Sequence, residues 1–426
     1  MKKNYFVNMR KEKKAIIDKF KFHVSSGKVK FYRKYGMKFV MGEREGSFIK
    51  DIEGKKVLLN LHCNGGVFNL GHRNRELIEI LKKALEKYDI GNHHLISKPR
   101  AELAEYISYL MPPDLDYVIF GVSGGEAIDT AIKIARGYTG RRKIISIKGG
   151  YHGHTGLALA AGDPKYREPF YSSSTDFVQV RFNDLNSMEE AIDRRTAAVI
   201  LETIPATLGM PIADKDYFRK VKRLCERRGA LLILDEVQSG LGRTGKLWAF
   251  QHFDVIPDIV VLGKGLSGGI YPITATVIRK DLEKIFKKDP FIHISTFGGA
   301  EPGAIVAKRV LEIVSDGGFL KNVLHKSELF SMYFNEIRRV EHTFVKGIRR
   351  LGLMMGLELK DEFSGPALTK AAYDRGALVV YANNDKSVVQ ILPPLTISEE
   401  EIKLSFEILK SAVKKAKYLR YLIKLL

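Results

Sequence analysis

The chain has 426 residues, of which 45% are hydrophobic and 28% charged, and this length and composition predict a globular protein of two or three domains. Its 70 Lys and Arg exceed its 49 Asp and Glu, which gives a formal net charge of +21. Collagen-like, disordered and disulfide-scaffold proteins are excluded, and the presence of only two cysteines, Cys63 and Cys225, favours a reducing, cytoplasmic compartment.

Most of the excess positive charge lies at the two ends of the chain. Residues 1–40 hold thirteen Lys and Arg against two Asp and Glu, and residues 401–426 hold seven against two, so these ends carry +16 of the +21. Because a nucleic-acid surface needs a basic face on the folded body, we expect solvated terminal helices and no nucleic-acid partner. We expect neither secretion nor membrane insertion, since no apolar run has the required length.

In chain order, the first 60 residues predict a basic helical start followed by a hairpin. Residues 48–51 and 56–59 are its strands, on either side of Glu53-Gly54. From residue 117 onward, short apolar runs alternate with amphipathic stretches. The runs predicted as strands are 117–120, here taken as buried, 143–147, 197–203, 231–234 and 259–262. The stretches 126–138 and 218–228 are predicted as helices, the second ended by Gly229.

This alternation predicts an α/β fold with a mostly parallel central sheet covered on both faces. Beyond Thr296, long helical patterns predict a smaller domain of helices on a short sheet, and Ser398 with Glu401 forms a capping box for the last helix. We therefore predict a large domain over 61–305 and a smaller α+β domain formed by both termini, residues 1–60 and 306–426.

Ligands of such sheets collect at the carboxyl ends of the strands, so the residues that follow each strand are the candidate site. Ser123-Gly124-Gly125 follows the first strand and opens a helix, an arrangement that suits a phosphate or simply makes a tight turn. Asp235 ends a buried strand, where a carboxylate needs a cation or a strong donor. A metal ion, an Arg, or the protonated ring nitrogen of a cofactor would each meet that need.

Two further strand ends supply an amine and an aromatic ring. Lys264 stands between Gly263 and Gly265 in a partly desolvated mouth, which lowers a lysine's pKa and favours a Schiff-base nucleophile and general base. Residues 149–154 place Tyr151 and two imidazoles on a flexible turn. A phosphate cradle, an acid, an amine and a stacking ring together are what pyridoxal 5′-phosphate requires.

From about Leu61 to Ile408 the chain resembles the class III pyridoxal-phosphate aminotransferases, the group that contains the ornithine, acetylornithine and 4-aminobutyrate enzymes. The strongest match is the run 232–245, Leu-Ile-Leu-Asp-Glu-Val-Gln-Ser-Gly-Leu-Gly-Arg-Thr-Gly, followed by Pro257-Asp258 and Gly263-Lys264-Gly265. The resemblance implies fold type I, a pyridoxal-phosphate cofactor and a homodimer with shared active sites.

The resemblance also implies residue roles. Lys264 would hold the cofactor as a Schiff base and move a proton, and Asp235 would keep the pyridine nitrogen protonated. Gln238 would bond the ring's phenolic oxygen, and Tyr151 would stack on the ring. The phosphate would be held by Ser123, Gly124 and Gly125, with Thr296 of the partner subunit.

The chain departs from the family at three charged positions that recognise substrate. His154 stands where ω-aminotransferases have an Arg for a distal carboxylate, and Gln390 where a second Arg binds the α-carboxylate. Thr207 replaces the Glu that neutralises the second Arg. Replacing an Arg–carboxylate fork with an amide is not conservative, so exchange between glutamate and 2-oxoglutarate is not implied. Glu202 ends a strand beside the site and is either a substrate-binding or a structural residue.

The predicted activity is the transfer of an amino group from an amine or amino acid to an oxo acid by a ping-pong mechanism. An isomerase on the same scaffold, a racemase, epimerase or aminomutase, is the alternative, because it returns the proton or the amine to the same molecule. No metal site is predicted, since His152, His154 and the adjacent His93 and His94 lack Cys or acidic partners at metal spacing.

Overall fold

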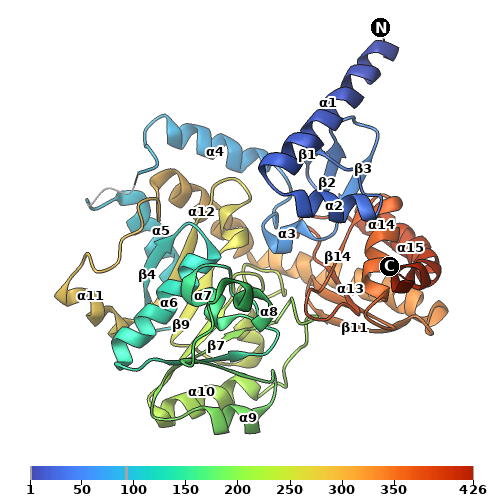
Figure 1. Ribbon diagram of the computed structural model, residues 1–426. Helices are drawn as coiled ribbons and strands as arrows, with labels where there is room; N and C mark the ends of the chain where they lie inside the picture. Colours follow the sequence, from blue (N-terminus) through green and yellow to red (C-terminus); the bar gives the residue numbers. More distant parts are fainter. Residues whose placement is uncertain (1, 92–94, 426) are drawn as a thin grey trace.

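The computed structural model describes residues 2–91 and 95–425. A large sheet with helices on both faces fills one half of the molecule, and the strands β1–β3 of the N-terminal segment lie together with the C-terminal helices and strands in the other half (Figure 1). His93 and His94 lie outside the described residues.

The large sheet has seven strands in the order β4-β10-β9-β8-β7-β5-β6. They are β4 Leu115–Gly121, β5 Lys143–Ile147, β6 Phe177–Val180, β7 Thr196–Glu202, β8 Leu231–Asp235, β9 Ile259–Leu262 and β10 Thr274–Arg279. Only β10 runs antiparallel to its neighbours within this sheet, which confirms the mostly parallel sheet and fold type I.

The central strands are buried on both faces because successive side chains enter different cores. Val199, Leu201 and Leu232 pack into one core, whereas Ile200 and Ile233 pack into the other. A strand with two apolar faces has a nearly continuous apolar sequence, as β7, β8 and β9 do.

The expectation of a buried strand at 117–120 is wrong. β4 lies at the edge of the sheet, Tyr117 is 40% exposed, and residues 118–120 are only half-buried. An apolar run of four residues does not distinguish an edge strand from a central one, because the strand's neighbours decide its exposure.

Helices cover both faces of this sheet. One core contains side chains of α4 Arg75–Leu85, α5 Lys98–Leu110, α9 Leu185–Ala191, α10 Tyr217–Arg228 and α12 Glu301–Val314. The opposite core contains side chains of α6 Gly124–Thr139 and α7 Gly156–Ala161. Shorter helices in this half are α8 Pro164–Arg167, α11 Lys284–Lys288, and the 3₁₀ turns η1 Glu168–Phe170, η2 Ala249–Phe253, η3 Lys264–Ser267 and η4 Lys280–Glu283. α10 ends at Gly229, which has φ +64°, as the sequence predicted.

Two four-stranded sheets form the other half. The first has the order β1-β2-β3-β13 and the second β11-β12-β15-β14. Their strands are β1 Met41–Glu45, β2 Phe48–Asp51, β3 Val57–Asn60, β11 Val345–Leu351, β12 Met354–Leu359, β13 Ala377–Leu378, β14 Val380–Tyr381 and β15 Val388–Ile391. The predicted hairpin is confirmed as β2 and β3.

The parallel pairing of β3 with β13 joins the first 60 residues to the last 50. The helices here are α1 Lys2–His23, α2 Ser26–Lys34, α3 Cys63–Gly66, α13 Gly317–Val340, α14 Ser364–Asp374 and α15 Glu399–Leu425. Leu59 and Leu61 share one core with side chains of α13, α14 and α15. The predicted capping box is confirmed: Glu401 N donates to Ser398 Oγ and Ser398 N to Glu401 Oε2. The domain boundaries stay a prediction.

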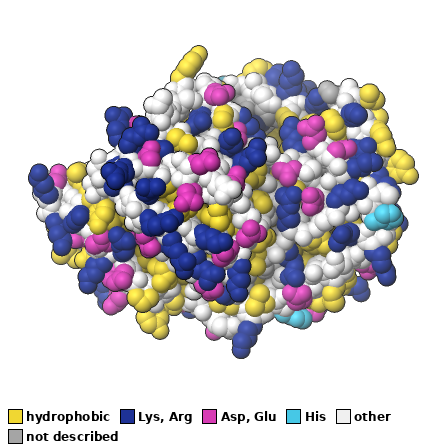
Figure 2. Space-filling model, turned by 90° about the horizontal axis from the view of Figure 1, so that it is seen from below, with side chains coloured by type: hydrophobic (Ala, Val, Ile, Leu, Met, Phe, Trp, Pro, Cys, Tyr) yellow, Lys and Arg dark blue, Asp and Glu magenta, His cyan; other side chains and the backbone are white. Residues whose placement is uncertain are grey.

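Among the described residues, no helix is both long and apolar enough to cross a membrane. Figure 2 shows many Lys and Arg side chains on the face seen from below, with Asp and Glu side chains between them.

Candidate active site

Three neighbouring strands bring the central site residues together at their carboxyl ends. Glu202 lies beside Asp235 in the register of β7 and β8, and Asp235 lies beside Val261 of β9. Lys264 begins η3, two residues after β9 ends. These three side chains therefore meet at the carboxyl ends of the central strands, because parallel strands end on the same side of a sheet.

Lys264 is partly exposed and points at Gln238, with its Nζ donating to Gln238 Oε1 at 2.7 Å. Burial lowers the pKa of Lys264, although the charges of Asp235 and Glu202 act in the opposite direction. The Lys264 backbone has φ +43°, a left-handed conformation that is uncommon for a residue with a Cβ and that clusters at functional sites.

Asp235 is 7% exposed and is held by His152, whose Nδ1 lies 2.9 Å from Asp235 Oδ2. The backbone N–H of Val237 donates to the other carboxylate oxygen at 3.0 Å. Burial opposes a charged ring at His152, but the bond to Asp235 and the charge of that carboxylate outweigh it and raise the pKa of His152. His152, which the sequence places on the same turn as Tyr151, is 3% exposed, and its ring makes this bond.

Glu202 supports the segment that carries Tyr151. Its Oε1 accepts a hydrogen bond from the backbone N–H of Tyr151 at 2.9 Å. Burial raises the pKa of Glu202 to about 7, against the opposing charge of His152. Tyr151 lies edge-on to His154, with ring centroids 5.3 Å apart, and both rings contact Tyr166.

The amino end of α6 forms a narrow backbone cradle next to these residues. Ser123 caps the helix by accepting from Glu126 N. A Cβ on Gly125 would lie 2.6 Å from Thr155 Oγ1, and one on Gly153 would lie 2.8 Å from Gly125 Cα. Glycine is therefore required here, and free N–H groups at the helix end suit an anion.

Val237 connects the cradle to the strand ends. A Cβ on Gly124 would lie 3.5 Å from Val237 Cγ1, and one on Gly263 would lie 3.2 Å from the same atom. Thr274 of β10 also donates to Ser123 O at 3.4 Å. The cradle, Asp235 and Lys264 are thus parts of one site.

Gln390 and Thr207, the two neutral residues expected near the substrate, each donate a side-chain hydrogen bond to a backbone carbonyl. Gln390 Nε2 donates to Ala206 O at 3.1 Å, and Thr207 Oγ1 donates to Gly149 O at 3.1 Å. Thr296 is exposed on the segment between α11 and α12, which packs against Phe120 of β4 at Gly298. Among the residues that the structure describes, no hydrogen bond joins Thr296 to the other site residues.

Two site residues were missed by sequence reasoning: His62, and His152 as the partner of Asp235. His62 precedes the turn in which a Cβ on Gly65 would lie 3.4 Å from Lys264 Cε, and burial, together with the charge of Lys264, lowers the pKa of His62 to about 4. Asp235 lies 83 positions from His152, and Lys264 lies still farther from His62. The only available signal was that His152 stands in the segment 149–154, which was already expected to carry part of the site.

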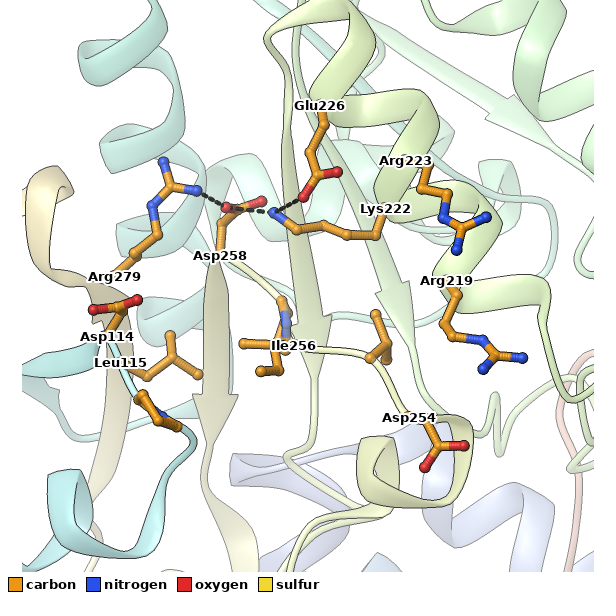
Figure 3. Close-up of a pocket in the computed structure, with 13 residues that line it drawn as sticks. Asp114, Leu115, Arg219, Lys222, Arg223, Glu226, Asp254, Ile256, Asp258 and Arg279 are labelled. Atoms are coloured by element: carbon orange, nitrogen blue, oxygen red, sulfur yellow. Dashed lines mark hydrogen bonds and ion pairs between the residues drawn. The ribbon is translucent and has the colours of Figure 1, made fainter.

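A cavity of about 520 Å³ lies on the side of the large sheet away from the site, next to the residues that precede β9 (Figure 3). Asp258 stands between Lys222, whose Nζ donates to it at 2.7 Å, and Arg279, which also bonds it. Because these charges neutralise one another and Leu232 N donates to the same carboxylate, we interpret this cluster as structural.

Comparisons with known proteins agree with this geometry. The family model for class III aminotransferases matches residues 31–413. A protein of Archaeoglobus fulgidus named uncharacterized aminotransferase is 52% identical over 97% of each chain, and an acetylornithine aminotransferase of Methanopyrus kandleri is 36% identical over 94% of this chain and 98% of the relative.

Among solved structures, the ornithine aminotransferase of Toxoplasma gondii has a TM-score of 0.83 and 25% identity, covering 96% of this chain and 99% of that one. Its description mentions pyridoxal phosphate at the active site. These findings support amino-group transfer, and none favours the isomerase alternative. The chain belongs to the class III aminotransferases and is a pyridoxal-phosphate-dependent enzyme.

Proposed function

We propose that Lys264 is the residue that holds pyridoxal phosphate and that Asp235 faces the ring nitrogen of the cofactor. The observation that supports this most directly is the meeting of an amine of lowered pKa, a buried carboxylate and a glycine cradle at one sheet edge. This donor set fits the cofactor: α6 offers N–H groups to a phosphate, Asp235 accepts from a protonated nitrogen, and Tyr151 offers a ring face.

When bound, the cofactor stores the amino group between donor and acceptor and withdraws electrons from the reacting carbon. The chain supplies the proton transfers and the orientation. With the cofactor bound, neutral Lys264 Nζ would take a proton from the reacting carbon of the substrate and deliver it to a carbon of the cofactor. Asp235 keeps the proton on the ring nitrogen, and His152 holds the carboxylate in place. Gln238 orients the amine, and Ser123, Gly124 and Gly125 bind the phosphate.

We propose a homodimer in which Thr296 reaches the phosphate of the partner subunit. The segment that carries Thr296 is apolar and exposed, with Ile292 60%, Ile294 52% and Phe297 51% exposed. Leu95 and Ile96 are also exposed and line a cavity of about 520 Å³ together with Ile294. Exposed apolar clusters of this kind mark protein interfaces.

The enzyme exchanges an amino donor and an oxo acid, and we propose that His154, Glu202, Thr207 and Gln390 contact these substrates. Their positions around the Lys264 and Tyr151 segments support this assignment. We further propose a cytoplasmic location, in keeping with two buried cysteines that are free thiols.

The proposal is tested by reconstituting the protein with pyridoxal phosphate. The wild-type protein gains the visible absorbance of a lysine-bound cofactor, and borohydride reduction places the label on the Lys264 peptide. Lys264→Ala loses both signals, whereas Lys215→Ala, at an exposed position, keeps them. A reduced label on another lysine contradicts the proposal.

A further inference from the structure

His293 attaches the exposed segment that carries Thr296 to helix α6. This segment, residues 289–299, connects α11 to α12 and consists of turns and bends. The His293 ring is partly buried and contacts two side chains of α6: its Nε2 lies 3.3 Å from Thr130 Oγ1, and its Nδ1 lies 2.9 Å from Lys133 Nζ. Because α6 begins with the glycine cradle, His293 joins the Thr296 segment to the helix that is proposed to bind the phosphate.

The two partners of the His293 ring define which of its nitrogens carries the proton. Thr130 Oγ1 donates its single proton to Glu126 O at 2.8 Å, so it accepts a hydrogen bond from His293 Nε2. The ammonium group of Lys133 can only donate, so His293 Nδ1 is unprotonated and accepts. The ring is therefore neutral in this arrangement, since a protonated ring would turn a second N–H toward the ammonium group.

The surroundings of His293 favour this neutral form. Burial and the charge of Lys133 lower the pKa of His293 from its ordinary value of 6.5, against the opposing charge of Glu126. Two further charged residues, Arg100 of α5 and Glu283 of η4, line the same cavity as His293. The bond from Lys133 is thus present at neutral pH and is lost as the pH falls through the lowered pKa of His293.

Thr296 lies between two points at which its segment meets the body of the protein. Three residues of chain span at most about 11 Å, so His293 restricts the position of Thr296. On the other side of Thr296, the segment approaches β4 closely, because a Cβ on Gly298 would lie 2.6 Å from Phe120 O. The cavity of about 520 Å³ described above lies beside the segment and is lined by Ile294 and by residues of β4. The segment can therefore shift if the contacts of His293 are removed.

We infer that His293 is a positioning residue for cofactor binding: its bonds to α6 hold Thr296 where it reaches the phosphate of the partner subunit. The inference rests on the proposed homodimer and on the proposed role of Thr296. A hydrogen bond weakens steeply with distance and angle, so a displaced Thr296 hydroxyl loses its bond to the phosphate. Loss of the His293 contacts therefore weakens the binding of pyridoxal phosphate but not of pyridoxal, which lacks the phosphate.

The test titrates pyridoxal phosphate and pyridoxal into cofactor-free protein and follows absorbance. In His293→Phe, which keeps a ring but loses both bonds, the dissociation constant for pyridoxal phosphate at neutral pH rises about 10-fold, and that for pyridoxal stays within about 2-fold. Thr296→Ala shows the same selective loss, and the double variant His293→Phe, Thr296→Ala loses no more than Thr296→Ala alone. The matched control, His342→Phe at an exposed position, binds both compounds like the wild type.

A pH series separates the hydrogen bonds of His293 from simple packing of its ring. The dissociation constant of His293→Phe for pyridoxal phosphate, divided by that of the wild type, falls toward 1 as the pH drops below 6.5, because the wild-type ring then gains a proton and loses the bond from Lys133. Titration of the cofactor's own phosphate cancels in this ratio. Lys133→Met, at an exposed position of α6, removes the same bond and shows a loss confined to pyridoxal phosphate, which covers the case in which His293→Phe does not fold.

Wild-type affinity for pyridoxal phosphate in Lys133→Met and His293→Phe, or a ratio that does not change with pH, overturns the inference. If Thr296→Ala weakens the binding of pyridoxal phosphate and these two variants do not, only the role of His293 fails. If Thr296→Ala also binds like the wild type, the proposed role of Thr296 fails as well, so the two failures are distinguishable.

Discussion

At the scale of single residues, the site keeps Lys264 reactive by restricting both its backbone and its amine. The φ of +43° is maintained by close neighbours: Ser267 Oγ donates to Lys264 O at 2.7 Å, and a Cβ on Gly265 would lie 2.8 Å from Asn69 Nδ2. Such a conformation costs on the order of 1–3 kcal/mol and persists only where surrounding contacts impose it.

The lowered pKa of Lys264 predicts how cofactor attachment depends on pH. The amine attacks only when neutral, and a pKa below 10.5 extends the neutral form to lower pH. The rate of cofactor attachment to cofactor-free protein should rise with pH and reach its midpoint below 10.5, as followed by stopped-flow absorbance. A midpoint at or above 10.5 contradicts this prediction.

Asp235→Asn should lower kcat by about 100-fold or more, because an amide does not provide the negative charge that keeps a ring nitrogen protonated. His152 would also lose its ionic partner. Steady-state kinetics measure the loss, with Asp214→Asn as an exposed control that retains wild-type kcat. An Asp235→Asn enzyme with unchanged kcat would show that the carboxylate has another role.

Lys264, Asp235 and Gln238 were predictable from sequence because each stands immediately after an apolar strand, where the parallel sheet itself creates the site. The partners of these residues were not predictable in the same way. His152 bonds a carboxylate that only the folded topology brings near, and a histidine's sequence neighbours do not indicate which carboxylate it meets.

At the scale of secondary-structure elements, Glu236 ties the end of β8 to η2. It is fully buried and accepts from Ala249 N at 2.8 Å, from Phe250 N at 3.0 Å and from Thr203 Oγ1. Burial raises the pKa of Glu236 to about 7, even though all three donors favour the ionised form.

Glu236→Gln should therefore destabilise the protein by about 1–3 kcal/mol, since the amide N–H₂ would face a backbone donor that it cannot pair. Urea unfolding monitored by circular dichroism measures the change. Glu226→Gln on the exposed side of α10 is the control and should stay within about 0.5 kcal/mol of the wild type. Equal urea midpoints for the two variants would show that Glu236 does not have this structural role.

The strands and helices of the large sheet were largely predictable because their apolar runs and caps are local signals. β9 and β5 match the predicted ranges, and α10 differs by one residue at its start. The edge position of β4 was not predictable, because it depends on β10 turning back antiparallel between β4 and β9.

At the scale of the whole molecule, the basic amino end projects away from the body as α1 (Figure 1). The middle of this helix is fixed to the body by Lys13, whose Nζ lies 2.9 Å from Asp51 Oδ1, and Asp51 is 3% exposed. The part of α1 before Lys13 is remote in sequence from every proposed site residue.

Deletion of residues 2–9 should leave the dissociation constant for pyridoxal phosphate within about 2-fold of the wild type, as measured by absorbance titration. Lys13→Ala should instead lower stability by about 1–3 kcal/mol, because it leaves a buried carboxylate without its cation. Loss of cofactor binding in the truncated protein would show that charge outside the folded body supports the site.

The buried Arg243 has a consequence for the response of the molecule to ionic strength. It links Asn69 and the turns at Leu353 and Pro393 through neutral acceptors, and no described carboxylate lies within ion-pair distance. Dissolved ions screen exposed charges but do not reach a contact sealed from solvent. The junction at which these three distant segments meet should therefore remain intact in concentrated salt, even while the repulsion among the surface cations of this +21 chain is screened.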